Sequence, residues 1–288
     1  MGDQGGSLRA NRGRLGMTEL LVLADIINEM RHDVEELAHI SNESDFNIYR
    51  NLLAAVFEGA YRCHLMRIRN PILARIAHKT RKLIYTANNI LDRSLTSLGF
   101  CDVLRRALNY VREINGRARR IIVCDALGLH DVLFFVYKFM RAETYILYEL
   151  NPGGMTRTFE FMIRSCPEVR ALIPHGVEEI TLQMVADILA KILKGTSDVY
   201  REIDDAIMSS PSFSDFDTLV YYLYFPLSRL INRAEEFIKI GYSVFIIADH
   251  GYDLNTEEMK LEHCWREDGP SLSVLAPIMI LREGVPRD

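Results

Sequence analysis

The spacing of apolar residues divides the chain into an all-helical first part and a mixed second part. Between residues 17 and 118, apolar positions recur every three or four residues, as they do along one face of a helix. Breaks in this pattern predict helices at 18–41, 46–68, 72–91 and 95–114. No strand pattern interrupts them. We therefore expect an all-helical module at 17–118, preceded by a disordered leader at 1–16 that is rich in glycine and arginine.

From residue 119 onward, short runs of Ile, Val, Tyr and Phe alternate with helical segments. The runs predict strands at 120–124, 144–148, 218–223, 243–248 and 276–281. The segments between them predict helices at 131–140, 156–164, 182–208 and 227–240. Such alternation is typical of βαβ units. Residues 119–288 are therefore expected to form an α/β domain, with a mainly parallel sheet and helices on both faces.

Composition and charge exclude few classes of protein. The chain has 288 residues, of which 49% are hydrophobic and 25% charged, and this is ordinary for a globular protein with a sizeable core. Its formal net charge of -5 disfavours broad, nonspecific attraction to nucleic acid. No apolar run is long enough to predict a membrane span. The five cysteines are odd in number and form no Cys-x-x-Cys pair, so we expect reduced thiols and a cytoplasmic protein.

Candidate chemistry begins where two predicted strands end. The strand at 243–248 ends on Asp249-His250-Gly251, and the strand at 120–124 ends on Asp125. Because ligands bind beyond the carboxyl ends of parallel strands, these carboxylates and the imidazole should meet at one edge of the sheet. Two carboxylates and an imidazole suit a divalent cation such as manganese, zinc or magnesium. His263, in the loop before the last strand, is a further candidate ligand.

A glycine turn before the helix at 156–164 supplies a candidate nucleophile. Two glycines followed by Thr156 can expose backbone N–H groups and a hydroxyl to one anion. Thr156 is the best N-cap candidate and the best nucleophile, Thr158 is the second choice, and Arg157 could hold a phosphoryl oxygen. Metal coordination would activate such a hydroxyl. A plain capped helix after a glycine turn is the open alternative.

Basic residues of the helical part allow two interpretations. Either they bind phosphate or nucleic acid, or they form the solvated face of an amphipathic bundle. The second is favoured because acidic residues lie nearby and aromatic residues are sparse. The residues concerned are Arg67, Arg69, Arg75, Lys79, Arg81 and Lys82.

The order of these motifs resembles the alkaline phosphatase superfamily. Within it, the chain is most similar to PglZ domain proteins, which are associated with bacterial and archaeal phage-defence systems. The motifs are Ile-Ile-Val-Cys-Asp125, a hydroxyl after a loop, Ile-Ala-Asp249-His250-Gly251 and Glu262-His263. The resemblance covers residues 120–281 and leaves the helical part outside it. It implies an alkaline-phosphatase-like fold with Asp125, a nucleophilic threonine, Asp249 and His250 around one metal, and His263 near a second.

The function implied by this resemblance is metal-dependent hydrolysis or transfer at a phosphate ester, with a phosphodiester or nucleic-acid-related substrate. The helical module would then be an adaptor for protein partners. One departure concerns the second metal. Two-metal members carry an Asp-x-x-x-His pair after the strand that corresponds to 218–223, and residues 225–231 contain no Asp or His. A catalytically degenerate member that binds a phosphorylated ligand or a protein is therefore the alternative.

Overall fold

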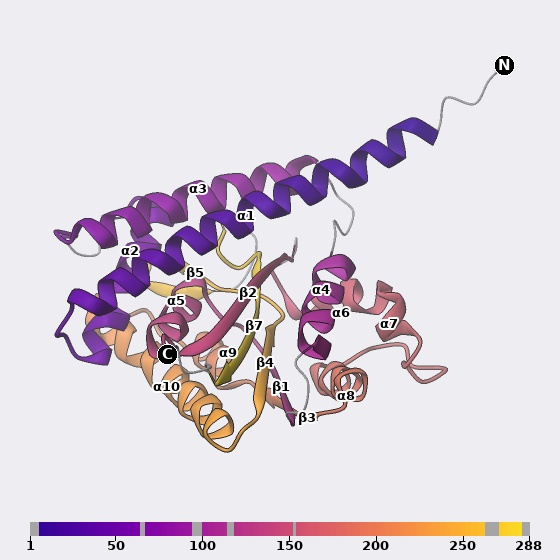
Figure 1. Ribbon diagram of the computed structural model, residues 1–288. Coiled ribbons are helices and arrows are strands. Elements are labelled where there is room, and N and C mark those ends of the chain that lie inside the picture. The colour runs from indigo at the N-terminus through magenta and orange to yellow at the C-terminus, as the bar shows by residue number, and fades with distance from the viewer. Residues whose placement is uncertain are drawn as a thin grey trace, which may run out of the picture.

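A mixed five-stranded sheet forms the centre of the protein (Figure 1). The computed structural model describes residues 6–63, 67–93, 100–113, 118–151, 154–262 and 271–283. The strand order is β2-β7-β4-β1-β3, and β5 and β6 form a separate hairpin. The strands are β1 Arg119–Cys124, β2 Ala142–Leu150, β3 Thr196–Tyr200, β4 Ser243–Ala248, β5 Asp253–Asn255, β6 Lys260–Glu262 and β7 Leu275–Glu283.

The domain is α/β, as the sequence predicts, but its sheet is mixed rather than mainly parallel. β1 runs parallel to both of its neighbours, β3 and β4, whereas β7 runs antiparallel to β4 and β2. The expected mainly parallel sheet is thus replaced by a mixed one. The connection explains the difference, because between β4 and β7 the described chain forms the β5–β6 hairpin and no crossover helix. Without a crossover, a strand returns antiparallel to its neighbour.

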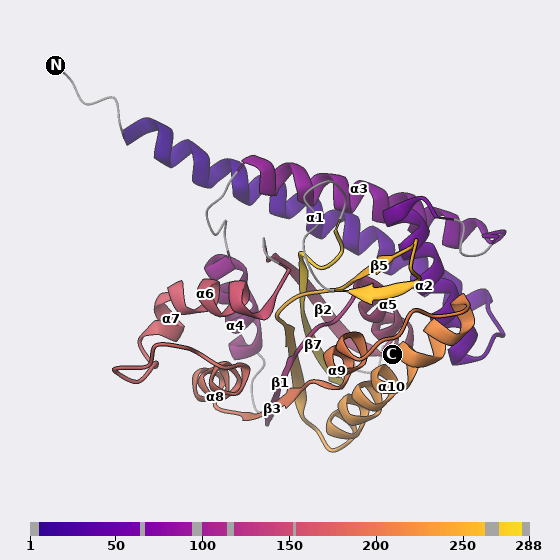
Figure 2. The same ribbon diagram turned by 180° about the vertical axis from the view of Figure 1, so that it is seen from behind.

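Helices cover both faces of the sheet, as the sequence predicts. Figures 1 and 2 show α4, α6, α7 and α8 on one side and α5, α9 and α10 on the other. The helix α1 begins at Gly6, within the segment expected to be a disordered leader. None of the described helices is long and apolar enough to cross a membrane. The helices are α1 Gly6–Ile40, α2 Asp45–Tyr61, α3 Pro71–Arg93, α4 Phe100–Glu113, α5 Leu129–Lys138, α6 Thr156–Ser165, α7 Pro167–Arg170, α8 Leu182–Leu193, α9 Glu202–Met208 and α10 Phe216–Lys239.

Two predicted elements are wrong. The single helix expected at 182–208 is interrupted, because α8 ends at Leu193, the capping residue Lys194 adopts a left-handed conformation with φ 53°, and β3 follows. Gly195 then passes so close to β1 that an added Cβ would lie 2.5 Å from the Arg119 carbonyl oxygen. The strand expected at 218–223 lies inside α10. There Leu219 and Leu223 are buried while Tyr221 is 64% exposed, a helical rather than an alternating pattern.

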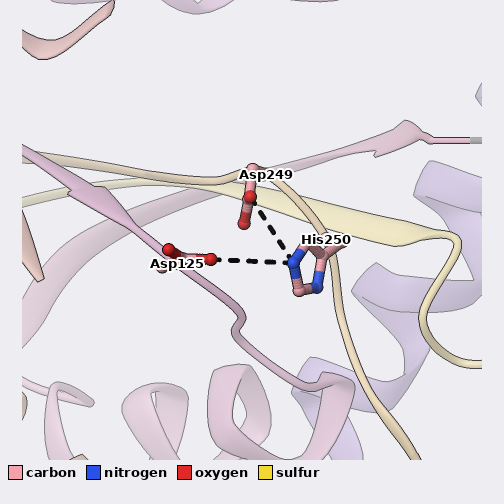
Figure 3. Close-up of side chains that lie close together, drawn as sticks. All are labelled: Asp125, Asp249 and His250. Carbon is pink, nitrogen blue, oxygen red and sulfur yellow. Dashed lines mark ion pairs between the residues drawn. The ribbon is translucent and has the colours of Figure 1, made fainter. Parts of the chain in front are cut away.

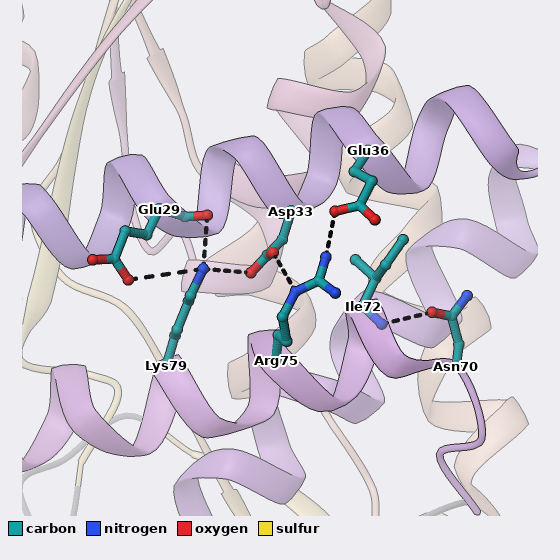
Figure 4. Close-up of polar contacts among 7 residues, drawn as sticks. All are labelled: Glu29, Asp33, Glu36, Asn70, Ile72, Arg75 and Lys79. Atoms are coloured by element: carbon teal, nitrogen blue, oxygen red, sulfur yellow. Dashed lines mark hydrogen bonds and ion pairs between the residues drawn. The ribbon is translucent and has the colours of Figure 1, made fainter.

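The long helices α1 and α3 lie side by side and are joined by ion pairs (Figure 4). Asp33 of α1 accepts hydrogen bonds from Arg75 Nε at 2.8 Å and Lys79 Nζ at 2.8 Å. Its side chain is only 6% exposed, so both cations are needed to stabilise the buried carboxylate. Two of the basic residues considered for phosphate binding therefore serve the packing of α1 on α3.

A disulfide joins α4 to the segment after α6. Cys101 and Cys166 are bonded, with their Cα atoms 5.2 Å apart. The expectation of reduced thiols is wrong for this pair, because the two residues are 65 positions apart and only the packing of α4 against α6 brings them together. Cys124 is a buried free thiol, the Cys63 thiol donates a hydrogen bond to the Phe57 carbonyl oxygen at 3.6 Å, and Cys264 lies outside the described residues.

Candidate metal centre

Three of the expected metal ligands meet at the carboxyl ends of β1 and β4. Cys124 and Ala248 are paired across the two strands, so the residues that follow them emerge side by side. One ligand atom from each of Asp125, Asp249 and His250 lies within 4.8 Å of the other two (Figure 3). His250 Nε2 is 3.7 Å from Asp125 Oδ1 and 3.5 Å from Asp249 Oδ2. A single cation between these atoms would contact all three side chains.

Only one of the two carboxylate oxygens of Asp249 accepts a hydrogen bond from the described residues. Its Oδ1 accepts a hydrogen bond from the Ala126 backbone N–H at 3.0 Å, while Ala126 itself adopts a left-handed φ of 63°. Its Oδ2 is buried and has no hydrogen-bond partner in the described part of the chain. A buried carboxylate oxygen without a donor is costly. A bound cation would remove that cost, so this side chain fits a metal ligand.

The imidazole of His250 is oriented for the same purpose. Its Nδ1 lies 2.7 Å from the Gly251 carbonyl oxygen, and that contact requires a proton on Nδ1. The lone pair then lies on Nε2, the atom that faces the two aspartates, as in histidine ligands of metals. Gly251 is required at the turn, because an added Cβ would lie 2.5 Å from the Leu272 carbonyl oxygen.

The surroundings of Asp125 strongly perturb its ionisation. Burial, followed by the charges of Asp249 and Asp204, raises the pKa of Asp125 to about 7. The charge that His250 would carry in its protonated form and a hydrogen bond from Thr156 oppose this shift in pKa. Asp204 stands near the start of α9, just beyond β3. Negative charge thus accumulates where a cation would stabilise it.

Asp204 was missed by the sequence analysis. Within a predicted helix at 182–208 it would occupy the helix interior, with no relation to Asp125. The pair Lys194-Gly195, followed by the β-branched residues Thr196 and Val199, could have revealed the helix end and the new strand. With β3 beside β1, Asp204 comes to the same edge of the sheet as Asp125.

The hydroxyl of Thr156 belongs to the same cluster. Its Oγ1 donates a hydrogen bond to Asp125 Oδ1 at 3.3 Å and lies 3.5 Å from His250 Nε2. The sequence predicts Thr156 as the N-cap of α6, and this prediction is wrong. That position is taken by Met155, which has no side chain able to cap, and the threonine hydroxyl is thereby left for the cluster. The hydroxyl of Thr158 forms no hydrogen bond with any described residue.

Asn151 fixes the start of α6 against the end of β4. Its buried side-chain Nδ2 donates to the Asp249 carbonyl oxygen at 2.8 Å and to the Met155 carbonyl oxygen at 2.9 Å. Gly154 has a φ of 55°, and an added Cβ would lie 2.5 Å from Ser273 Oγ. These contacts hold Thr156 close to the aspartates. Asn151 is not among the site residues that the sequence predicts.

The buried carboxylate of Asp131 forms hydrogen bonds with the loops that follow β1 and β4. Asp131 accepts hydrogen bonds from Tyr49 of α2 at 2.9 Å, from Tyr252 at 2.8 Å and from the Gly128 backbone N–H at 2.7 Å. His130 Nε2 lies 2.6 Å from the same Tyr252 hydroxyl. Asp131 therefore ties α2, the loop after β1 and the loop after β4 together, beyond its role in capping α5.

A cavity of about 570 Å³ lies beside Thr156. Arg157 and Phe161 of α6 line it, and both are exposed. Glu160 lines it as well, and burial together with the charges of Asp249 and Glu179 raises the pKa of that carboxyl. The volume suits a small organic ligand. His263, the remaining candidate ligand, lies outside the described residues.

Comparison with known proteins assigns the chain to no family: no family model matches it, and no curated protein matches it either. The similarity to PglZ domain proteins therefore stays a prediction from Asp125, the hydroxyl of Thr156 and Asp249-His250. Any functional conclusion has to come from the geometry of these side chains.

Proposed function

We propose that the protein is a metal-dependent hydrolase or transferase that acts on a phosphate ester. The observation that supports this most is the position of Thr156 Oγ1, 3.3 Å from one carboxylate and 3.5 Å from the imidazole of a three-residue cluster. A hydroxyl in this position has potential metal ligands on one side and a cavity of ligand size on the other. Nucleophilic attack on phosphorus requires both.

The cluster would hold one divalent cation through Asp125, Asp249 Oδ2 and His250 Nε2. Mixed oxygen and nitrogen ligands suit zinc or manganese, and magnesium with additional waters. Such an ion supplies Lewis acidity, which lowers the pKa of a nearby hydroxyl and polarises a phosphoryl oxygen. The strongest support for a bound cation is Asp249 Oδ2, which is buried and accepts no hydrogen bond from the described residues.

In the proposed reaction, Thr156 Oγ1 attacks phosphorus and gives its proton to Asp125 Oδ1, the nearest acceptor. The new bond joins Thr156 to phosphorus, and the leaving oxygen departs with the bonding electron pair and takes up the proton held by Asp125. Arg157, at the wall of the cavity, would bind phosphoryl oxygens and stabilise their charge. Water then hydrolyses the phosphothreonine, or an acceptor alcohol takes the phosphoryl group.

Turnover of aryl phosphate monoesters and diesters tests this proposal, with manganese, zinc and magnesium supplied in turn. Thr156→Ala should abolish turnover, because it removes the nucleophile. Thr158→Ala is the matched control and should retain it, since the Thr158 hydroxyl forms no hydrogen bond to the cluster. Equal activity of wild type and Thr156→Ala would refute the assignment of the nucleophile. A preference for diesters would support the substrate class that the resemblance implies.

The second candidate function is binding without turnover, as a phospho-ligand or protein-binding component of a larger assembly. It is favoured by the presence of a single cluster of three potential ligands within the described ranges. One metal lacks the partner ion that stabilises the second oxygen in two-metal phosphoryl transfer. Metal-dependent binding of phosphate, without turnover of any ester, would distinguish this function from catalysis.

A further inference from the structure

A second cavity, of about 430 Å³, lies where the end of α2, the middle of α3 and the β5–β6 hairpin come together. Figures 1 and 2 both show β5 beside α2 and α3. Arg81, Tyr85 and Asn88 line one wall and share one face of α3, because they are four and three residues apart. Tyr61 and Arg62, at the end of α2, line the cavity as well. No residue of the candidate metal centre borders this cavity.

The charge of this cavity is positive. Arg62 and Arg81 are exposed and form no ion pair with any described residue, and no described acidic side chain lines the cavity. Elsewhere in the described chain, Arg75, Arg105 and Arg229 are each bonded to a carboxylate. Two guanidinium groups without a counter-ion, at the edge of a concave surface, favour an anion and above all a phosphate.

Arg62 also occupies an unusual backbone position. It ends α2 in the left-handed conformation, with φ 55° and ψ 28°. Helix ends of this kind usually carry glycine, because other residues are strained there. Strained residues concentrate at ligand sites, where the side chain is needed in spite of its backbone cost. From this position Arg62 lines the cavity.

The α3 side of the cavity also carries the aromatic ring of Tyr85 and the side-chain amide of Asn88. Tyr85 is 70% exposed, so its aromatic face is open for stacking. The Asn88 side chain forms no hydrogen bond with the described residues, and its Oδ1 is shielded from solvent without a donor. An aromatic face binds nucleobases by stacking, and a side-chain amide pairs with the polar edge of a base. Together with the arginines, these groups match the three parts of a nucleotide.

We propose that this cavity binds a nucleoside phosphate. The base stacks on Tyr85 and bonds to Asn88, while the phosphates contact Arg62 and Arg81. The volume corresponds to a free nucleotide rather than to a length of nucleic acid. The site is independent of the proposed metal centre, so failure of either proposal leaves the other standing.

Calorimetric titration of the full chain with ATP, in the presence of a chelator, tests the proposal. Chelation prevents recruitment of the nucleotide through a metal. We expect saturable binding of one ATP per chain, with affinity lowered about tenfold in Arg81→Ala, which loses one charge-assisted contact. Tyr85→Ala should reduce ATP binding towards that of inorganic triphosphate. Lys82→Ala is the matched control, because Lys82 is exposed, adjacent to Arg81 and not part of the cavity wall.

Absence of ATP binding, or equal binding by wild type and Arg81→Ala, would overturn the assignment. If the protein binds a single-stranded oligonucleotide instead of ATP, the cavity is a nucleic-acid site. Since Arg81 and Tyr85 are exposed, their variants should fold, and circular dichroism verifies this. Loss of ATP binding in Asp249→Asn with retention in Arg81→Ala would instead place the nucleotide at the metal centre.

Discussion

At the scale of single residues, the two aspartates of the candidate centre differ in their surroundings. Asp249 is fully buried, and its backbone and one carboxylate oxygen are fixed by Asn151 and Ala126. Asp125 is more open and is repelled by neighbouring carboxylates. The rigid Asp249 would define the metal position, whereas Asp125 would accept the proton of the Thr156 hydroxyl.

This difference predicts how the stability of the metal-free protein depends on pH. The folded-state pKa of Asp125 is raised from 3.8 to about 7, so between these values folding takes up a proton. Stability should therefore fall as the pH rises through this window. Asp125→Asn cannot ionise and should be more stable than wild type above pH 7 by about 2 kcal/mol, a discounted conversion because the carboxyl is partly solvent-accessible.

Urea unfolding with a chelator, from pH 5 to pH 8, measures this effect. The stability difference between Asp125→Asn and wild type should grow with pH, which separates Asp125 from the other titrating groups. A difference that is constant over this range would show that the pKa of Asp125 is not raised.

At the scale of elements, the disulfide connects α4 to the end of α6, the helix that lines the cavity of the candidate site. Cys166 directly follows α6, whose first residue is Thr156, and Cys101 lies in α4. Cross-linking restricts the unfolded chain and keeps the end of α6 against α4. The link thus contributes to positioning the helix that carries the proposed nucleophile.

Reduction should therefore destabilise the oxidised protein by about 2 to 4 kcal/mol, since the loop closed between the two cysteines is long. Cys101→Ser should be equally destabilised and should no longer respond to reductant. Cys63→Ser, which leaves the Cys101–Cys166 disulfide in place, is the control. Denaturant unfolding with and without reductant gives these values, and an unchanged midpoint on reduction would contradict the disulfide.

Much of the fold follows from local patterns in the sequence. The buried runs of β1 and β4 and the helical spacing in α3 were strong enough to predict those elements. β3 was not predicted, since its burial is only partial and its residues continue the apolar spacing of α8. In α10, aromatic and β-branched residues favoured a strand, but burial on one helical face decided the structure.

At the scale of the whole molecule, the helical part is closely joined to the sheet. Tyr49 and Tyr61, both of α2, donate hydrogen bonds to the buried carboxylates Asp131 and Asp253 at 2.9 and 2.5 Å. Arg31 of α1 donates to the Thr144 carbonyl oxygen in β2 at 2.8 Å. The loops that carry the candidate ligands are therefore supported from α2, in addition to any adaptor role of this part.

Removal of one such contact should be costly. Tyr49→Phe leaves the buried Asp131 Oδ1 without its donor, and we expect a loss of about 1 to 3 kcal/mol in the free energy of unfolding. Tyr85→Phe is the matched control, because the Tyr85 side chain is exposed and its hydroxyl bonds to no described residue. Urea unfolding compares the two variants. Equal stability of Tyr49→Phe and wild type would show that α2 does not support the loops in this way.

The candidate site was predictable only in part. Asp125, Asp249 and His250 follow directly on strand ends, so their proximity could be inferred from the sequence. Asp204, Asn151 and Tyr49 could not be inferred, because their roles depend on the position of β3 and on contacts between distant segments. These contacts arise from tertiary packing, which local periodicity does not encode.

The central claim is that Asp125, Asp249 and His250 bind a divalent cation. Calorimetric titration of the metal-free protein with manganese and zinc tests it most directly. We predict one ion per chain, and at least about a 100-fold loss of affinity in Asp249→Asn, which removes the charge of the buried ligand. Asp205→Asn, an exposed carboxylate on α9, is the control and should bind as wild type does. Unchanged metal binding by Asp249→Asn would contradict the account.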